Sequence, residues 1–118
     1  MLIEWNKITN FYIACGYTDM RKQIDGLAAI VQLKFGMELD EQSLFLFCGR
    51  KADRIKALYW DGTGYILLYK RMANQGFKWP RNQSEVRQIT KQQLTWLLDG
   101  LCIDQKTAFK KGPQPTLF

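Results

Sequence analysis

The 118-residue chain contains no histidine. Without an imidazole there is no Ser-His-Asp or Cys-His catalytic pair, and no zinc site can have a histidine ligand. The chain also lacks the side chain that ordinarily titrates near neutral pH. The sequence therefore argues against hydrolytic chemistry that depends on a histidine base.

Cysteine is also scarce, and the three residues present, Cys15, Cys48 and Cys102, lie far apart in the chain. No CxxC pair exists, three thiols cannot form a four-thiolate cluster, and an odd number does not favour a full disulfide framework. The neighbours of Cys15 and Cys48 are apolar. We expect buried, reduced thiols, as in cytosolic proteins.

Long hydrophobic runs are absent. The longest strongly apolar runs, 44–48 and 65–69, have five residues each, whereas a membrane-spanning helix needs about twenty. The first residues contain neither a basic segment nor an apolar stretch of signal-peptide length. We therefore expect a soluble cytoplasmic protein with no membrane partner.

What remains is the composition of a folded protein, with 47% hydrophobic and 24% charged residues. This length supports one hydrophobic core. The last residues are polar, basic and interrupted by proline, which is typical of a flexible terminus. We expect one domain over residues 1–105, followed by a flexible tail at 106–118.

Positive charge is concentrated in the middle of the chain. The sequence has 17 Lys and Arg against 11 Asp and Glu, a net charge of +6. Residues 49–91 alone contain ten of these cations and three of the carboxylates, so they carry more than the whole excess. A clustered basic surface attracts polyanions, and nucleic acid is the commonest one in a cytoplasm.

Two amphipathic segments predict helices. Apolar residues recur at three- and four-residue steps from about 20 to 35, after Thr18 or Asp19 as the N-cap. A Thr-x-x-Gln capping box at 90–93 precedes a second helix that should extend through Leu101.

Runs rich in β-branched and aromatic residues predict strands at 11–15, 44–48, 55–60 and 65–69, with a further short strand near 86–89. The connections between the middle three are too short for crossover helices, so these strands should form an antiparallel meander. We expect an α+β fold in which two helices pack on one face of an antiparallel sheet of three to five strands.

The meander should bring the first turn and the end of its third strand to the same edge. Six cations would converge there. Two residues of the following loop would extend the surface: a lysine that could contact phosphate, and a tryptophan that could stack on bases or act as a wedge. The candidate nucleic-acid-binding residues are Arg50, Lys51, Arg54, Lys56, Lys70, Arg71, Lys78 and Trp79.

Catalysis would need a different set of residues. Two-metal nucleases hold their ions with two or three carboxylates, and Asp19, Asp61 and Glu85 could supply them. Asp19, however, is placed as a helix cap and Asp61 as a turn residue. The sequence therefore predicts no catalytic residue, no metal and no cofactor, with a metal-dependent nuclease as a distant alternative.

Several stretches resemble one family of bacterial proteins. Residues 16–27 resemble a signature written G-x-T-D-M-R-K-x-x-D-G-L, and the similarity extends over roughly residues 12–103. The matching positions include Thr18, Asp19, Met20, Arg21, Lys22, Asp25, Gly26, Trp60, Asp61, Gly62 and Gly64. The family is the Orf-two-like accessory proteins of IS-sixty-six-type insertion sequences. A Gln-Ile pair replaces the usual small and aromatic pair at 23–24.

This resemblance implies a small protein encoded beside a larger DDE-type transposase and needed for efficient transposition. It implies no particular molecular activity. Together with the basic meander, it predicts a non-catalytic accessory protein that binds the DNA of the element ends. Its partners would be the transposase and the other element-encoded protein.

A second hypothesis has the protein as an adaptor that binds the transposase without touching DNA. Aromatic side chains often dominate protein interfaces. The anchors would be Trp60, Tyr65, Phe77 and Trp79.

Overall fold

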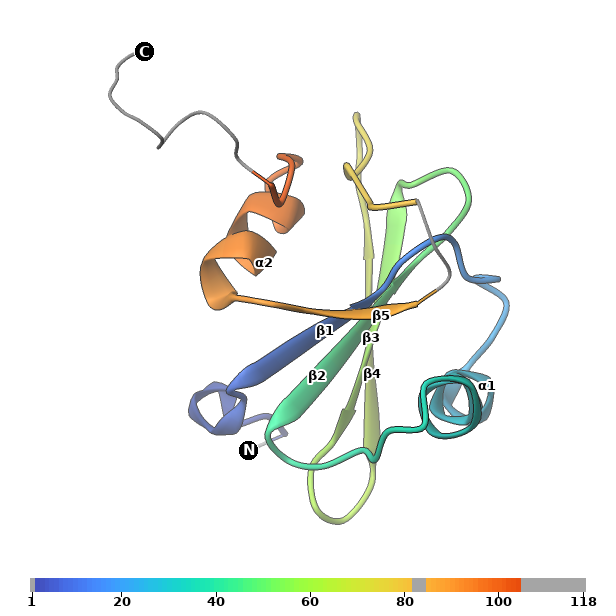
Figure 1. Ribbon diagram of the computed structural model, residues 1–118, viewed down its shortest axis with the longest axis vertical. Coiled ribbons are helices and arrows are strands. Elements are labelled where there is room, and N and C mark those ends of the chain that lie inside the picture. The colour runs from blue at the N-terminus through green and yellow to red at the C-terminus, as the bar shows by residue number, and fades with distance from the viewer. Residues whose placement is uncertain (1, 82–84, 105–118) are drawn as a thin grey trace.

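The computed structural model describes residues 2–81 and 85–104, so the predicted tail at 106–118 lies outside the described part of the chain. Figure 1 shows the arrangement of its helices and strands. In chain order these are η1 (Trp5–Lys7), β1 (Asn10–Ala14), α1 (Ile24–Ala29), η2 (Ile30–Lys34), β2 (Ser43–Cys48), β3 (Arg54–Trp60), β4 (Tyr65–Arg71), β5 (Val86–Ile89) and α2 (Lys91–Leu98).

The five strands form one sheet in the order β4-β3-β2-β1-β5. Strands β2, β3 and β4 make the predicted antiparallel meander. Strand β1, however, pairs parallel to β2 and antiparallel to β5. The prediction of a purely antiparallel sheet is wrong for the β1–β2 pair. The reason is the long connection at 15–42, which contains α1 and returns the chain to the other end of the sheet before β2 begins.

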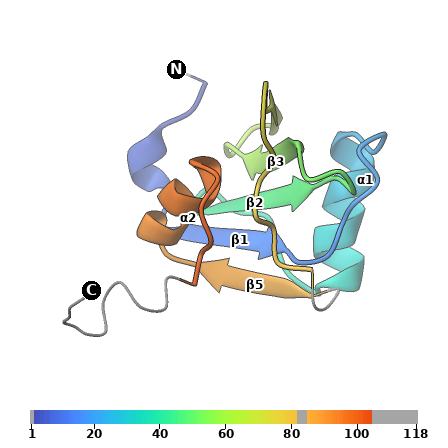
Figure 2. The same cartoon turned by 90° about the horizontal axis from the view of Figure 1, so that it is seen from above.

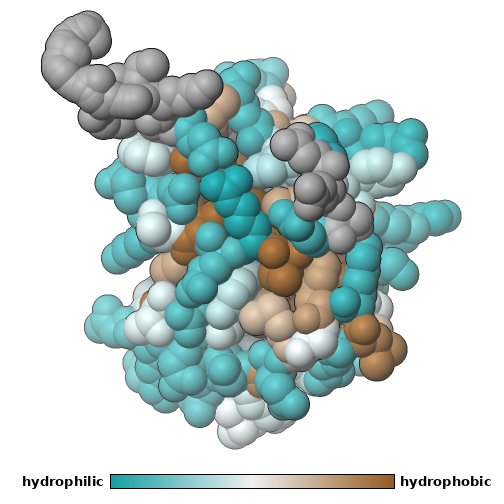
Figure 3. All heavy atoms as spheres, in the orientation of Figure 1, coloured by the Kyte–Doolittle hydropathy of each residue, from teal (hydrophilic) through white to brown (hydrophobic). Residues whose placement is uncertain are grey.

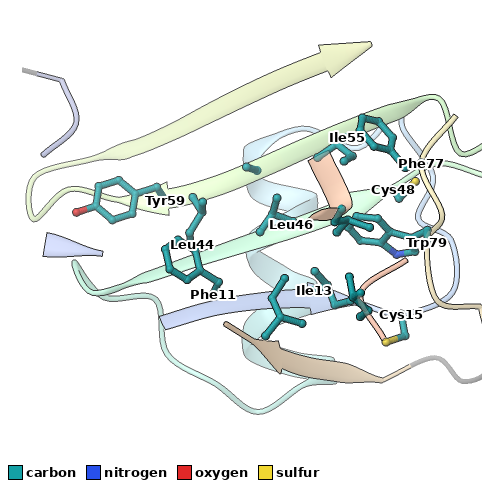
Figure 4. Close-up of a cluster of buried hydrophobic side chains, with 14 of the residues drawn as sticks. Phe11, Ile13, Cys15, Leu44, Leu46, Cys48, Ile55, Tyr59, Phe77 and Trp79 are labelled. Carbon is teal, nitrogen blue, oxygen red and sulfur yellow. The ribbon is translucent and has the colours of Figure 1, made fainter. Parts of the chain in front are cut away.

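Strand β2 lies at the centre, and all six of its residues are buried. Its side chains alternate between two hydrophobic clusters. Phe45 and Phe47 join the cluster that contains Leu27 and Val31, on and just after α1. Leu44 and Leu46 join a second cluster (Figure 4). The leucines of α2 pack on this second cluster.

The two helices therefore cover opposite faces of the sheet, and the prediction that both pack on one face is wrong. They also lie on opposite sides of the molecule in two perpendicular views (Figures 1 and 2). A strand whose neighbouring side chains point to opposite faces is buried throughout only if both faces are covered. In Figure 3, hydrophobic residues gather in the centre of one face and hydrophilic residues surround them.

The first helix begins later than predicted. Residues 19–22 form a turn in which the Asp19 carbonyl accepts a hydrogen bond from the backbone N–H of Lys22 (3.1 Å). The Asp19 carboxylate accepts from the backbone N–H of Arg21 (2.9 Å). Gln23 is extended and precedes the first helical residue, without a side-chain cap. The prediction that Thr18 or Asp19 caps the helix is wrong because the Asp19 side chain is used inside this turn.

The second helix follows the predicted capping box. The Thr90 hydroxyl accepts from the backbone N–H of Gln93 (3.0 Å), and the Gln93 side chain accepts from the Thr90 N–H (2.8 Å). The helix ends at Leu98 and not at Leu101, because Gly100 adopts a positive φ of 84°. Within residues 2–81 and 85–104, neither this helix nor any other has the length and apolar character to cross a bilayer.

Candidate nucleic-acid interface

The cations of the meander meet at one end of the sheet. Arg54, at the start of β3, is the direct cross-strand partner of Arg71, at the end of β4. Lys70 pairs with the next residue of β3, and Arg50 and Lys51 are exposed on the β2–β3 turn. The topology thus brings together five of the cations that the meander places at this edge. We call Arg50, Lys51, Arg54, Lys70 and Arg71 the basic end.

The segment between β1 and α1 packs against the same end. The Thr18 N–H donates to the carbonyl of Cys48 (2.8 Å), where β2 ends. The Arg81 guanidinium donates to the carbonyls of Gly16 (2.9 Å) and Gly49 (2.8 Å), so it joins this segment to the β2–β3 turn. Two stretches about thirty residues apart in the sequence therefore build one surface. No local pattern in the sequence predicts this contact.

Lys56 is buried and anchors the segment between β1 and α1 by hydrogen bonds. Its side chain is only 6% exposed, and its ammonium donates to the carbonyls of Met20 and Lys22, at 2.8 Å each. The structure therefore places this predicted phosphate contact in the interior. Its positive charge satisfies two backbone carbonyls instead of facing solvent.

Trp79 is also buried, at 5% exposure, and its indole N–H donates to the Ala14 carbonyl (2.8 Å). It packs with Phe77 in the cluster on the α2 face (Figure 4). Lys78, between these two aromatics, is exposed. Of the four aromatic anchors of the adaptor hypothesis, Trp60 is half-buried and Tyr65 is exposed, and their rings contact each other edge to face.

A hollow of about 460 Å³ lies between the β2–β3 turn and the segment that joins β1 to α1. We call it the first hollow. Four cations and two carboxylates belong to its lining, so its charge is positive. Its lining residues are Tyr17, Thr18, Asp19, Met20, Arg21, Gly49, Arg50, Lys51, Asp53 and Arg54.

A second hollow, of about 370 Å³, adjoins the first. Met20 and Arg54 line both hollows, and Tyr69 of β4 lines the second one. The Arg54 Nε atom is buried and lies 3.8 Å from the Asp53 carboxylate, too far for a hydrogen bond. Among the buried side-chain nitrogens and oxygens of the described residues, it is the one without a hydrogen-bond partner.

The first hollow also contains a close ion pair. The Arg21 guanidinium donates to both oxygens of Asp19, with the shortest distance 2.8 Å. The side-chain hydrogen bonds from Arg21 hold the pKa of the Asp19 carboxyl well below its usual range. Asp19 therefore stays ionised at physiological pH, and its charge offsets that of Arg21. Asp53, whose carboxylate lies 3.8 Å from Arg54, is the second carboxylate of the lining, so the hollow keeps two cations in excess.

The carboxylates of the nuclease alternative do not come together. Asp19 lies beside the basic end, where β3 begins, whereas Asp61 lies in the turn after β3, at the opposite end of the strand. In the part of the chain that the structure describes, no three His, Cys, Asp or Glu side chains are grouped so that they could hold a metal ion. This geometry gives a three-carboxylate metal site no support.

Comparison with known proteins yields one family and two curated relatives. The sequence profile of the family described as IS66 Orf2 like protein matches residues 9–108. The chain is 36% identical over 90 residues to the uncharacterized protein y4hO of Sinorhizobium fredii (strain NBRC 101917 / NGR234), covering 76% of this chain and 78% of that protein. It is 27% identical over 89 residues to the uncharacterized protein y4jC of the same strain, covering 75% and 76%. No solved structure matches.

Proposed function

The chain belongs to the IS66 Orf2-like family of transposition-associated accessory proteins, and from this we propose that it binds the DNA of its element through the basic end. In this proposal the protein is not itself an enzyme. It holds DNA for a separate transposase, which carries out strand cleavage and transfer.

The observation that carries the proposal is the direct pairing of Arg54 with Arg71 across β3 and β4. Like charges directly opposite each other on neighbouring strands destabilise a sheet. Here the pair stands beside the exposed cations of the β2–β3 turn, which add to the repulsion. A polyanion bound at this end would offset the repulsion, and DNA offers phosphates at regular spacing along a surface.

The chemistry of the basic end suits phosphate better than a carboxylate partner of one fixed shape. Three of its five cations are arginines, whose planar guanidinium groups bind phosphate oxygens with two hydrogen bonds at once. Contacts of this kind position a protein on DNA without reading its sequence. The proposal therefore concerns affinity for the DNA backbone and leaves base recognition to other contacts.

Fluorescence anisotropy with labelled element-end DNA tests the proposal. Binding that uses about five phosphates should weaken roughly 10²- to 10³-fold between about 50 mM and 200 mM salt. Replacing Arg54 and Arg71 together by Gln should weaken binding at low salt and make the salt dependence shallower by about two phosphates. The matched control is Lys91→Gln, which removes an exposed cation at the start of α2.

Absence of binding at the lower salt would contradict the proposal, as would equal effects of the double variant and the Lys91 control. Co-purification with the transposase distinguishes the adaptor hypothesis from the proposal of DNA binding. A complex that survives nuclease treatment and is lost in Tyr65→Ala would support direct protein contact through the Trp60–Tyr65 pair.

A further inference from the structure

We infer that the basic end prefers single-stranded DNA, with unpaired bases stacked at Tyr17 and Tyr69 and a backbone phosphate bound between them at Arg54. This inference rests on the proposed function and specifies which form of DNA the site takes. It depends on the two hollows, which share Arg54 and contain one exposed tyrosine each.

The two tyrosines are unusually accessible for residues that line hollows. Tyr17 is 57% exposed and Tyr69 is 54% exposed. An aromatic ring is a large apolar surface that a folded protein normally buries in good part. Two such rings, one in each of two adjoining hollows of positive charge, form a pair of stacking surfaces with cations beside them. Proteins that bind single strands use this combination, because every base has a face that can stack.

Arg54 lies where a phosphate between two stacked bases would be placed. It lines both hollows, and its Nε has no hydrogen-bond partner in the structure. A buried N–H without a partner is uncommon. The Arg54 side chain as a whole is 42% exposed, so its terminal N–H groups can donate to a phosphate oxygen in charge-assisted hydrogen bonds, and a small rotation of the guanidinium would bring Nε to the same phosphate. The same phosphate would reduce the repulsion between Arg54 and Arg71, its cross-strand partner.

The surroundings of Tyr17 are fixed before any ligand binds. The Arg50 guanidinium carbon lies 4.5 Å from the centre of the ring, and its Nη2 donates to the Tyr17 hydroxyl (2.6 Å). Arg81 lies 5.9 Å from the ring centre and is itself anchored to the Gly16 carbonyl. Rings and guanidinium planes both stack on bases. A surface already ordered in this way loses little side-chain entropy on binding.

The surroundings of Tyr69 are fixed in a similar way. The Lys56 ammonium lies 5.9 Å from the centre of this ring and is tied to the carbonyls of Met20 and Lys22. Lys56 thus contributes to the site although it is almost fully buried, because it lines the second hollow and holds the segment between β1 and α1 through the carbonyls of Met20 and Lys22.

The size of the hollows favours unpaired bases over a duplex. Volumes of about 460 and 370 Å³ are those of sites for small ligands. In a duplex the base faces are stacked on one another, so a protein ring can reach them only where the strand is unpaired. A duplex could contact the cations of the basic end but could not use the two tyrosines.

Anisotropy at one salt concentration, with a single strand and a duplex of the same length, tests this inference. We expect the wild-type protein to bind the single strand at least fivefold more tightly. Tyr17→Leu and Tyr69→Leu should each weaken single-strand binding by roughly 5- to 150-fold, the usual effect of losing one stacked base. Both variants should change duplex binding much less than single-strand binding, and circular dichroism together with the urea midpoint reports whether each variant is folded.

Matched controls come from the same strand. Tyr65 lies at the other end of β4, on the same face as Tyr69 and also exposed, and Tyr65→Leu should leave single-strand binding unchanged. Tyr69→Phe keeps the ring and should retain the affinity. If the duplex binds as tightly as the single strand and the two Leu variants behave as wild type, the inference is overturned while the proposed function stands. If neither DNA binds, both are overturned.

Discussion

Lys56 is a residue whose role differs from the one that its position in a strand predicts. It follows a buried isoleucine in β3, so strand alternation places it on an outer face. In the structure that face is covered by α1 and by the segment before it. The lysine is retained inside because two carbonyls of that segment need donors, and its long side chain reaches both.

Lys56→Met tests this role, because Met keeps an unbranched side chain, one atom shorter, and removes the donor. Two carbonyls would lose a hydrogen bond from a charged group, so we expect the free energy of unfolding to fall by about 1–3 kcal/mol. Urea denaturation measures the change. Lys70→Met, on the exposed end of the neighbouring strand, should leave the urea midpoint nearly unchanged. A midpoint for Lys56→Met equal to or above that of the wild type would rule out this role.

Among the elements, the β3–β4 turn follows most directly from its sequence. The Asp61 carboxylate accepts from the backbone N–H groups of Thr63 and Gly64, both at 2.8 Å, and from the Thr63 hydroxyl at 3.0 Å. Gly62 adopts a positive φ of 97°. These are local interactions within four residues, so the Asp-Gly pair is enough to predict the turn.

The same turn predicts a pH dependence of stability. The hydrogen bonds, that of the Thr63 backbone first, lower the pKa of Asp61 in the folded protein. A lowered folded pKa gives stability that is present above the unfolded value of about 3.9 and is lost as the pH falls through the folded pKa.

Asp61→Asn, which keeps an acceptor oxygen without the charge, should therefore be less stable than wild type at pH 7, and the difference should shrink below about pH 4. Thermal unfolding across this range measures it. Asp61→Ala, which removes the acceptor, should be less stable than Asp61→Asn at every pH. A difference between wild type and Asp61→Asn that stays constant down to pH 2 would contradict the assignment.

Elements defined by nearby residues could be predicted, whereas those defined by distant contacts could not. The capping box of α2 and the meander turns depend on a few adjacent residues. The start of α1 does not, because Arg21 competes for the Asp19 carboxylate that would otherwise cap the helix. The unbroken apolar run at 44–47, by contrast, could have predicted that helices cover both faces of the sheet. A strand without alternation is typical of a sheet covered on both faces.

At the scale of the whole molecule, the candidate site could be predicted only in part. The convergence of Arg54 with Arg71 follows from the meander alone, since antiparallel strands return the chain to the same end. The burial of Trp79 depends on packing against Ala14, sixty-five residues away. The contribution of Tyr17 depends likewise on the segment before α1 folding back onto the β2–β3 turn.

The three cysteines report on the integrity of this whole arrangement. Cys15 and Cys48 are buried in the cluster on the α2 face (Figure 4), whereas Cys102 is exposed. Burial raises the pKa of Cys48 to about 11 and also raises that of Cys15. The thiolate is the reactive form. Both buried thiols should therefore resist alkylation for two reasons: reagents cannot reach them, and they remain protonated.

Alkylation with iodoacetamide at pH 8, followed by mass spectrometry, should modify Cys102 first in the native protein. Cys48 lies in the central strand, between β1 and β3, so its modification requires the sheet to open and should follow global unfolding. Cys15 lies just after β1 and should react earlier than Cys48 if that end opens locally. Adding urea should bring all three thiols to similar rates. Fast modification of Cys48 in the native protein would contradict its place in the core, and Cys102→Ser should abolish only the early adduct.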